Sequence, residues 1–402
     1  MKVIYLHQYF KTPSENGGTR SYDLAKSFVQ SGYYVYMVTT TSNEKYKNTR
    51  WKVEMCDGIE VHYLYLPYDN SMSYFERCIA FLKFMILASV RLLKIKGDLL
   101  LATSTPLTIG IPALLKKTLH KTPLVFEVRD VWPEAVIAVG AVKNRLVQKV
   151  LYLLEKLIYN KSDIIVPLSV DMKKSITARY PYLERKIPFV VENIAEVNRF
   201  SMTEKINLKE WLGVEPRFSI LYAGTFGKVN NIHYVIELAS RVIQLDSSIC
   251  FILMGSGSEK NEIIEIAKKR GLFNKNVFFP DPVSKRDLDK IYSSVSMGSS
   301  FVAPIQELWA NSANKFFDTL AAGKPVLINH YGWQADVIEN RNIGYVLPPS
   351  LDDKAVSKFV EYSKDINLHR EQEQNSRTVA ISEYSLEVAS SKYLKIFNKI
   401  HV

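Results

Sequence analysis

The chain has 402 residues, more than one hydrophobic core usually accommodates, and its 47% hydrophobic and 23% charged content is ordinary for a globular protein. Its three cysteines, Cys56, Cys78 and Cys250, lie far apart without metal-ligand spacing, which argues against a disulfide framework or a zinc site and favours a reducing compartment. The first residues, MKVIYLHQYF, predict a buried strand and lack the pattern of a signal peptide.

The net charge of +11 is concentrated in the first half of the chain. Residues 1–195 contain 27 Lys and Arg against 17 Asp and Glu, whereas residues 196–402 contain 25 against 24. Such a one-sided excess indicates a polyanionic partner, which could be an anionic membrane, a nucleic acid or a pyrophosphate. Nucleic acid is the weaker interpretation, because no helix-turn-helix, zinc finger or RNA-binding strand signature is present.

Near-continuous apolar runs alternate with helical patterns along the whole chain, which is typical of parallel sheets covered on both faces. The pattern predicts an α/β fold of two doubly wound domains in tandem, 1–195 and 196–380. A last helix within 381–402 either ends on the second domain or crosses back onto the first. The predicted strands are 2–10, 34–41, 59–67, 97–104, 123–130 and 162–169, then 218–224, 249–254, 276–281, 296–304, 324–330 and 343–349.

Residues 75–93 come closest to a membrane segment. Arg77, Lys83 and Arg91 interrupt the apolar run, so it falls short of the roughly 18 apolar residues of a spanning helix. The pattern favours an interfacial helix with a basic fringe, and a second basic group lies at 114–121. A core-facing helix with three solvated charges is the alternative.

Polar residues follow several predicted strands, at the sheet edge where open α/β sheets bind ligands. After the first strand, Gly17 and Gly18 lead into a helix near Thr19, and its free N–H groups together with Arg20 favour an anion. After 123–130, the pair Arg129-Asp130 indicates a place near the reacting centre. The alternatives are a plain glycine turn and an ion pair that caps the next helix.

Two further glycine turns follow strands of the second domain and predict phosphate-binding loops. They contain Gly224, Thr225 and Lys228, and Gly255 and Gly257.

A fifth polar group lies in ELWANSANKFFDTLAAGKPVLIN. Asn311 and Ser312 are predicted to cap a helix that begins near residue 313. Asn314, Lys315 and Asp318 then share a helix whose first turns face the cleft, where Lys meets a phosphate and Asp accepts hydrogen bonds from a ribose diol. The alternative is an exposed Lys–Asp pair worth about half a kcal/mol.

These stretches, in this order, resemble the GT-B fold and the retaining, nucleotide-sugar-dependent glycosyltransferases of family 4. The similar motifs are NGGTRSYDLAKSF, EVRDVWPE, LYAGTFGKVNNIHYVIELA, FILMGSGSEK and NKFFDTLAAGKPVL. EVRDVWPE in particular is similar to bacterial O-antigen and capsule enzymes of the N-acetyl-L-fucosamine transferase type.

The resemblance implies roles for single residues. Gly17 and Gly18 would lie near the donor phosphates, Lys315 on the diphosphate, Asp318 on the ribose in place of a glutamate, and Arg129 near the transferred sugar. The candidate catalytic residues are Arg129, Asp130 and Glu307, and the candidate donor-binding residues are Gly17, Gly18, Arg20, Gly224, Thr225, Lys228, Gly255, Gly257, Asn311, Ser312, Asn314, Lys315 and Asp318.

The chain departs from the family pattern at several positions. Ala310 stands where the first of two paired acids is expected, with Glu307 three residues earlier as its candidate replacement. Thr225 and Asn230 stand where Arg and Lys are common, and Lys228 is the candidate substitute.

The expected chemistry is metal-independent and needs no cofactor, on the expectation that the chain contains no Asp-x-Asp triplet. Arg20, Lys228, Lys315 and helix N-termini would then stabilise the leaving nucleotide, expected to be UDP. The basic first domain predicts a polyprenyl-pyrophosphate acceptor and a cytoplasmic protein at the inner face of the membrane. A GT-B epimerase and a nucleotide-sugar-binding protein that has lost catalysis are the alternatives.

Overall fold

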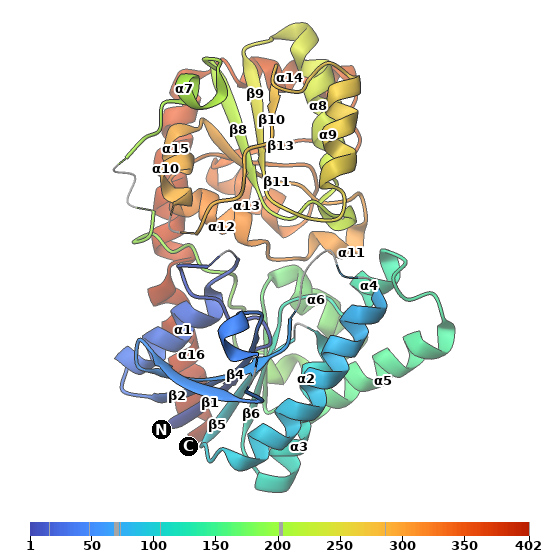
Figure 1. Cartoon of the computed structure of the whole chain (residues 1–402), viewed down its shortest axis with the longest axis vertical. Coiled ribbons are helices and arrows are strands. Elements are labelled where there is room, and N and C mark those ends of the chain that lie inside the picture. The colour runs from blue at the N-terminus through green and yellow to red at the C-terminus, as the bar shows by residue number, and fades with distance from the viewer. Residues whose placement is uncertain are drawn as a thin grey trace.

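The computed structural model describes residues 1–15, 17–47, 49–67, 72, 74–104, 106–200, 204–285 and 287–401, with only the backbone at 74 and 401. Two α/β domains lie one above the other, the first blue to green and the second yellow to orange (Figure 1). Within the described residues, a seven-stranded sheet forms the first domain and a six-stranded sheet the second. The predicted two-domain α/β architecture is confirmed.

The first sheet has the order β3-β4-β2-β1-β5-β6-β7, parallel except for β3. Sequence analysis missed the short strand β3, which forms a hairpin with β4. Asp57 and Gly58, both with positive φ, make the turn, and this Asp-Gly pair was a usable hairpin signal. The strands are β1 (Lys2–Leu6), β2 (Tyr34–Thr41), β3 (Lys52–Cys56), β4 (Ile59–Tyr65), β5 (Leu99–Thr103), β6 (Leu124–Val128) and β7 (Ile164–Pro167).

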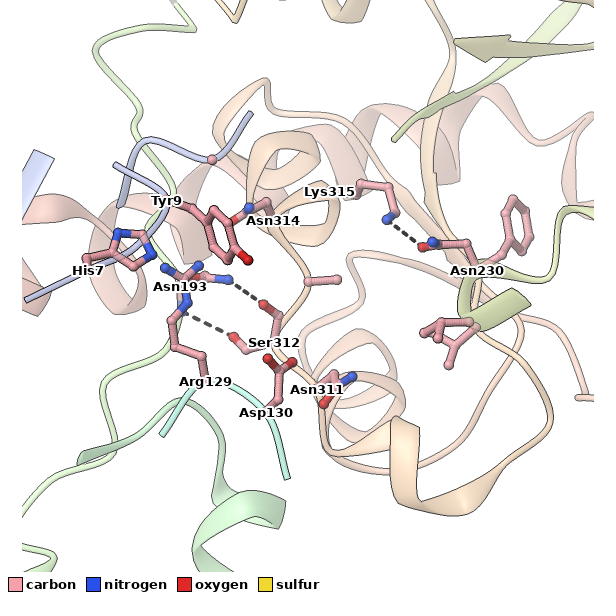
Figure 2. A pocket seen from close by; sticks show the side chains of 15 residues that line it. His7, Tyr9, Arg129, Asp130, Asn193, Asn230, Asn311, Ser312, Asn314 and Lys315 are labelled. Atoms are coloured by element: carbon pink, nitrogen blue, oxygen red, sulfur yellow. Dashed lines mark hydrogen bonds between the residues drawn. The ribbon is translucent and has the colours of Figure 1, made fainter. Parts of the chain in front are cut away.

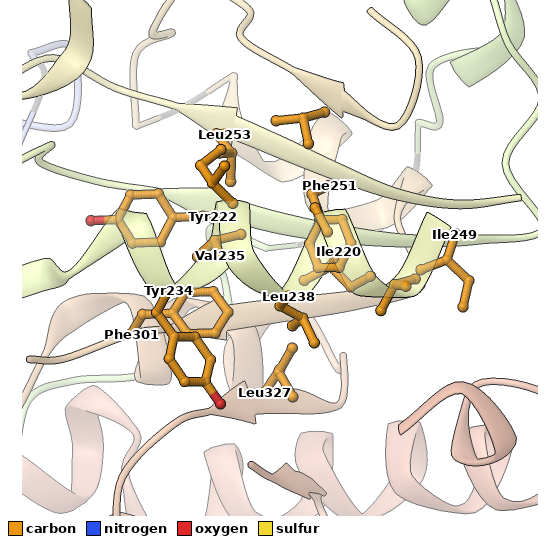
Figure 3. Packing of buried hydrophobic residues seen from close by; sticks show 14 of the residues in the cluster. Ile220, Tyr222, Tyr234, Val235, Leu238, Ile249, Phe251, Leu253, Phe301 and Leu327 are labelled. Atoms are coloured by element: carbon orange, nitrogen blue, oxygen red, sulfur yellow. The ribbon is translucent and has the colours of Figure 1, made fainter. Parts of the chain in front are cut away.

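The second sheet is parallel throughout, in the order β10-β9-β8-β11-β12-β13. Its strands are β8 (Phe218–Ala223), β9 (Ile249–Met254), β10 (Val277–Phe278), β11 (Met297–Ser300), β12 (Val326–Ile328) and β13 (Gly344–Val346). Figure 3 shows one face of this sheet, where Ile220 and Tyr222 of β8 pack with Val235 and Leu238 of the covering helix α8. Burial of apolar side chains on both faces explains why these strands read as continuous hydrophobic runs.

The helices cover both faces of each sheet (Figure 1). Those of the first domain are α1 (Arg20–Gln30), α2 (Tyr74–Lys94), α3 (Gly110–His120), α4 (Glu134–Ala138), α5 (Arg145–Lys161) and α6 (Val170–Arg179). Those after it are α7 (Leu208–Leu212), α8 (Ile232–Leu245), α9 (Lys260–Lys269), α10 (Leu288–Ser294), α11 (Gln306–Trp309), α12 (Asn314–Ala321), α13 (Trp333–Arg341), α14 (Asp353–Tyr362), α15 (Ile366–Glu383) and α16 (Leu386–His401).

The C-terminal helix α16 returns to the first domain and packs beside α1 (Figure 1). Phe397 contacts Phe28 of α1 edge to face, with ring centroids 5.0 Å apart, and Tyr393 is buried in the same core. Where the chain passes from the first domain to the second, Ile194 still packs in the core of the first domain. The next residue, Ala195, packs in the core of the second.

Replacing Phe397 with Ala should destabilise the first domain by about 4 kcal/mol, because the substitution leaves a cavity beside Phe28. Urea unfolding followed by circular dichroism should show an earlier transition of this domain. Lys395→Ala, on the exposed face of α16, is the matched control and should change the free energy of unfolding by less than about 0.5 kcal/mol. Equal effects of the two substitutions would contradict this packing.

Candidate functional site

Two adjoining pockets lie between the domains, where the carboxyl ends of both sheets meet. The Arg129 pocket, of about 290 Å³, is lined from the first domain by His7, Tyr9, Arg129, Asp130 and Asn193 (Figure 2). The Asp318 pocket, of about 420 Å³, is lined mainly by the second domain. The two pockets share the lining residues Gly18, Ala313, Asn314 and Lys315.

Lys315 stands between the two pockets, in the first turn of α12. Its Nζ donates a hydrogen bond to Asn230 Oδ1 at 3.0 Å and lies 5.1 Å from the centre of the Tyr222 ring. Burial lowers the pKa of Lys315 to about 8, against the opposing effect of Asp318. The side chain is therefore a cation at neutral pH that holds its proton weakly until an anion approaches.

Asp318 lines its pocket but already has a partner that sequence analysis missed. Its Oδ2 accepts from the ammonium of Lys285, which comes from the loop before α10, and both side chains are buried. The apolar residues Pro282, Val283 and Leu288 line the same pocket. The pair therefore places a charged donor and a charged acceptor next to an apolar wall.

The glycine turns have different roles in the structure. Gly17, Gly18, Gly224, Thr225 and Gly255 line the Asp318 pocket. Gly255 and Gly257 both have φ near +150°, and a Cβ at either would overlap the facing loop, at 1.7 Å from Gly224 O and 2.2 Å from Phe226 O. Gly257 lines neither pocket, so its requirement for glycine comes from loop packing.

Asn311 and Ser312 do not cap a helix as predicted. Helix α12 begins after Ala313 and has no side-chain cap, whereas Ser312 bonds across to the first domain. Its Oγ accepts from the backbone N–H of Asn193 at 3.2 Å, and its carbonyl accepts from the Asn193 amide (Figure 2). Both predicted residues still line the Arg129 pocket.

Arg20 is not available to a donor phosphate, which corrects the sequence prediction. Its guanidinium is buried and donates to Glu127 through Nε at 3.2 Å and Nη2 at 3.0 Å. The remaining donors reach the carbonyls of Val191 and Glu192. Burial opposes the charge on Glu127, but Arg20 and further hydrogen bonds lower its pKa to about 2.

Two other predicted residues also lie outside both pockets. Glu307 is exposed on α11 and lines a separate pocket of about 450 Å³ with Glu134 and Asp171. Ala310 is buried against Val131, so no carboxylate occupies that position. Lys228 is exposed in a short 3-10 turn, Lys228–Asn230, whose last residue holds Lys315 instead.

Arg129 and Asp130 both line the Arg129 pocket at the end of β6. Within the described residues neither forms a salt bridge, so the alternative of a helix-capping ion pair is not supported. Burial raises the pKa of Asp130, an effect that Arg129 opposes.

His7 is buried beside these residues, and its Nδ1 lies 2.8 Å from Ser21 Oγ. Burial, together with Arg129, lowers the pKa of His7 to about 3, so it is neutral at physiological pH. Sequence analysis passed over His7, Tyr9, Asn193 and Lys285. His7 and Tyr9 lay within the predicted strand 2–10, whereas the observed strand ends at Leu6 and leaves both residues just beyond its carboxyl end.

The chain does contain one Asp-x-Asp triplet, Asp287-Leu288-Asp289, which corrects the expectation that it has none. The triplet lies at the start of α10, where Asp287 accepts from Ser284 Oγ at 2.6 Å and Asp289 is buried near Ser293. Neither carboxylate lines the Arg129 pocket or the Asp318 pocket. The described residues contain no group of three or more His, Cys, Asp or Glu side chains arranged to hold a metal ion.

Two family models match the chain in succession. Residues 17–187 match the glycosyl transferase 4-like domain, and residues 204–379 match glycosyl transferases group 1. Among curated proteins, spore coat protein SA of Bacillus subtilis is 22% identical over 58% of this chain, and alpha-D-kanosaminyltransferase of Streptomyces kanamyceticus is 20% identical over 49%. The matches span only 64% and 49% of those proteins.

Solved structures match over the full chain. Sucrose-phosphate synthase from Thermosynechococcus elongatus superposes with a TM-score of 0.75 at 14% identity, covering 100% of this chain and 99% of that one. Anabaena Alr3699/HepE, solved in complex with UDP and glucose, gives 0.69 at 14% identity, covering 99% and 100%. At these identities the likeness shows the fold, and it confirms the predicted GT-B architecture.

Lys285→Met should lower stability by about 3 kcal/mol, because it leaves the Asp318 carboxylate buried without its partner. The double variant Lys285→Met/Asp318→Leu removes both charges and should recover most of this loss. A thermodynamic cycle from urea unfolding of wild type, both single variants and the double variant measures the coupling. Strictly additive effects would show that the two side chains do not interact.

Proposed function

The chain belongs to the glycosyltransferases of group 1 and family 4-like type with the GT-B fold, and on that premise we propose that it transfers a sugar from a UDP-linked donor to a lipid-linked saccharide. The observation that carries this proposal is the shared rim of the two interdomain pockets, where Lys315 stands between Asp318 on one side and Arg129 with Asp130 on the other. A donor that spans both pockets would place its diphosphate at this lysine.

The Asp318 pocket offers a suitable surface to each part of a nucleotide diphosphate. Pro282, Val283 and Leu288 give an apolar wall for the base, and the Asp318 carboxylate lies within the same pocket for the ribose hydroxyls. Gly17 and Gly18 let the backbone approach the phosphates at the rim. The complex of the structural neighbour with UDP supports uridine as the base.

Departure of UDP requires stabilisation of the charge that develops on its phosphate, and Lys315 supplies that cation. The transferred sugar then lies in the Arg129 pocket beside Arg129 and Asp130. We assign retention of configuration and independence of metal ions to this reaction on the family resemblance. Closure of the domains would exclude water, which would otherwise hydrolyse the donor.

The acceptor is proposed to be a polyprenyl-pyrophosphate saccharide of O-antigen or capsule assembly, met at the cytoplasmic face of the membrane. Helix α2 supports this proposal, because it has features of both alternatives considered for residues 75–93, a core-facing helix and an interfacial helix. One face, with Phe84 and Leu92, is buried in the first core. The other exposes Phe75 at 74%, Leu82 at 53% and further apolar residues to solvent. No described helix combines the length and apolarity needed to cross a bilayer.

A nucleotide-sugar-binding protein without turnover is the second candidate, favoured by the placement of Ala310. That position is buried against Val131, Leu168 and Met172, and Glu307 does not line the Arg129 pocket. Formation of a glycosylated product from a UDP-sugar and a lipid-linked saccharide separates the enzyme from the binding protein.

UDP should raise the melting temperature of the wild-type protein more than GDP or ADP does. Lys315→Ala and Asp318→Ala should each abolish most of this shift, because they remove the proposed diphosphate and ribose contacts. Lys275→Ala, an exposed lysine of the same domain outside the pocket, is the control and should leave the shift unchanged. An undiminished UDP shift in both pocket variants would refute the donor site.

UDP affinity should fall as the pH rises above about 8. The pKa of Lys315 in the free protein is about 8, so above this pH the side chain loses the proton and the positive charge that would bind the diphosphate. Below that pH the lysine is charged and this contribution is complete. Isothermal titration from about pH 7 to about pH 9.5 measures the slope. Lys315→Arg keeps its charge over this range and should flatten the profile, so an identical slope in both proteins would assign the dependence to another group.

A further inference from the structure

Helix α5 of the first domain combines a buried side with an exposed apolar side. It is well anchored on one side, where Ile158 and Tyr159 join the core. Its other side exposes five large apolar side chains, with Leu146 at 72% and Leu153 at 59%. The five are Leu146, Val147, Val150, Leu153 and Leu157.

Beside this apolar face runs a basic groove of about 520 Å³. Arg145, Lys149 and Lys156 line it, and none of the three forms a salt bridge within the described residues. Tyr152 and Tyr180 line it as well, together with Gln148 and Leu153, and no acidic residue does. The groove thus offers three cations and further hydrogen-bonding groups to an anion.

Two acids beside the groove, Glu134 and Glu155, share a single arginine. Arg179 pairs with Glu134 and donates to Glu155 Oε1 at 2.8 Å, and Tyr180 donates to the second oxygen of Glu155 at 3.1 Å. Both carboxylates therefore already have a cationic partner, and neither lines the groove.

The groove is connected to the Glu307 pocket by side-chain contacts. Tyr180 of the groove donates to Glu155, which also accepts from Arg179, and Arg179 pairs with Glu134 of the Glu307 pocket. Val131 and Ala310 line that pocket, and the residues next to them in sequence, Asp130 and Asn311, line the Arg129 pocket. Side-chain contacts and neighbouring residues thus connect the α5 groove with the Glu307 pocket, and that pocket with the Arg129 pocket.

We propose that the α5 groove binds the pyrophosphate of the lipid-linked acceptor, with the apolar face of α5 in the membrane boundary. The saccharide then follows the Glu307 pocket toward Asp130. This assignment rests on the proposed function and names the site at which its acceptor is held. It also gives the exposed Glu307 a place along the acceptor.

The chemistry of the groove favours an anionic amphiphile over a second copy of the chain. In a two-fold dimer through α5, the row of Arg145, Lys149 and Lys156 would approach its own copy, and like charges repel. In a pyrophosphate attached to an apolar chain, the pyrophosphate would contact the cations of α5 and the apolar chain would contact its leucine face. Neighbouring α3 adds exposed Leu115 and Leu119 to the apolar surface.

The test compares two triple variants of full-length protein in vesicle flotation. Arg145→Gln/Lys149→Gln/Lys156→Gln removes the groove cations, and Lys143→Gln/Lys161→Gln/Arg185→Gln removes equal charge from exposed positions outside the groove. Vesicles contain phosphatidylcholine alone, with phosphatidylglycerol, or with a long-chain polyprenyl pyrophosphate at matched charge. The groove variant should lose about tenfold more affinity for the pyrophosphate vesicles than the control variant.

Three outcomes would overturn the assignment. Equal losses of affinity in both triple variants would show that the whole basic surface binds vesicles without a specific site. If soluble inorganic pyrophosphate binds tightly and Leu146→Gln/Leu153→Gln does not weaken it, the groove is a site for a free anion. A wild-type dimer that these leucine substitutions dissociate would identify a second copy of the chain. The UDP-induced thermal shift, measured on every variant, is independent of the groove, so its absence in wild type would instead refute the proposed donor function.

Discussion

The buried ion pair between Arg20 and Glu127 is the interaction on which the geometry of the site depends. Glu127 also accepts from Thr103 of β5 at 2.7 Å and from Tyr393 of α16, so one carboxylate joins two strands, α1 and the C-terminal helix. Removing two charges from water is costly, and the cost is met only because nearly every donor and acceptor finds a partner. The network thereby holds the start of α1, which follows Gly17 and Gly18, against the end of β6, which leads to Arg129.

The same arginine also orders the connection between the domains. Its contacts with the carbonyls of Val191 and Glu192 position the next residue, Asn193, which bonds to Ser312 of the second domain. Two more contacts cross the cleft nearby, from Ser169 Oγ to the Ala310 carbonyl at 2.6 Å and from the Trp333 N–H to Asp171 at 2.8 Å. The segment that contains α12 is therefore bonded to the first domain on both sides.

The surface of the first domain has two distinct regions, a polar one at the strand ends and an apolar one on the covering helices. Its strand ends face the second domain and form the Arg129 pocket, whereas α2, α3 and α5 expose apolar side chains elsewhere (Figure 1). The excess of positive charge noted in residues 1–195 contributes to both regions, as Arg129 in the pocket and as the cations of α5 in the groove. Under the proposed function, these two groups of charges would meet a nucleotide diphosphate and an anionic lipid head group, respectively.

Local pattern was enough to predict the two sheets, because strands buried on both faces are apolar throughout, and it placed Lys315 and Asp318 together because they are three residues apart on one helix. The local sequence pattern could not show which residue each charged side chain would contact. Arg20 meets an acid 107 residues away, Lys285 reaches Asp318 from another loop, and Asn193 meets Ser312 across the cleft. Such pairings depend on how distant segments pack. For that reason the tertiary structure alone decided that Arg20 pairs with Glu127, that Glu307 lies outside the Arg129 and Asp318 pockets, and that α16 packs on the first domain.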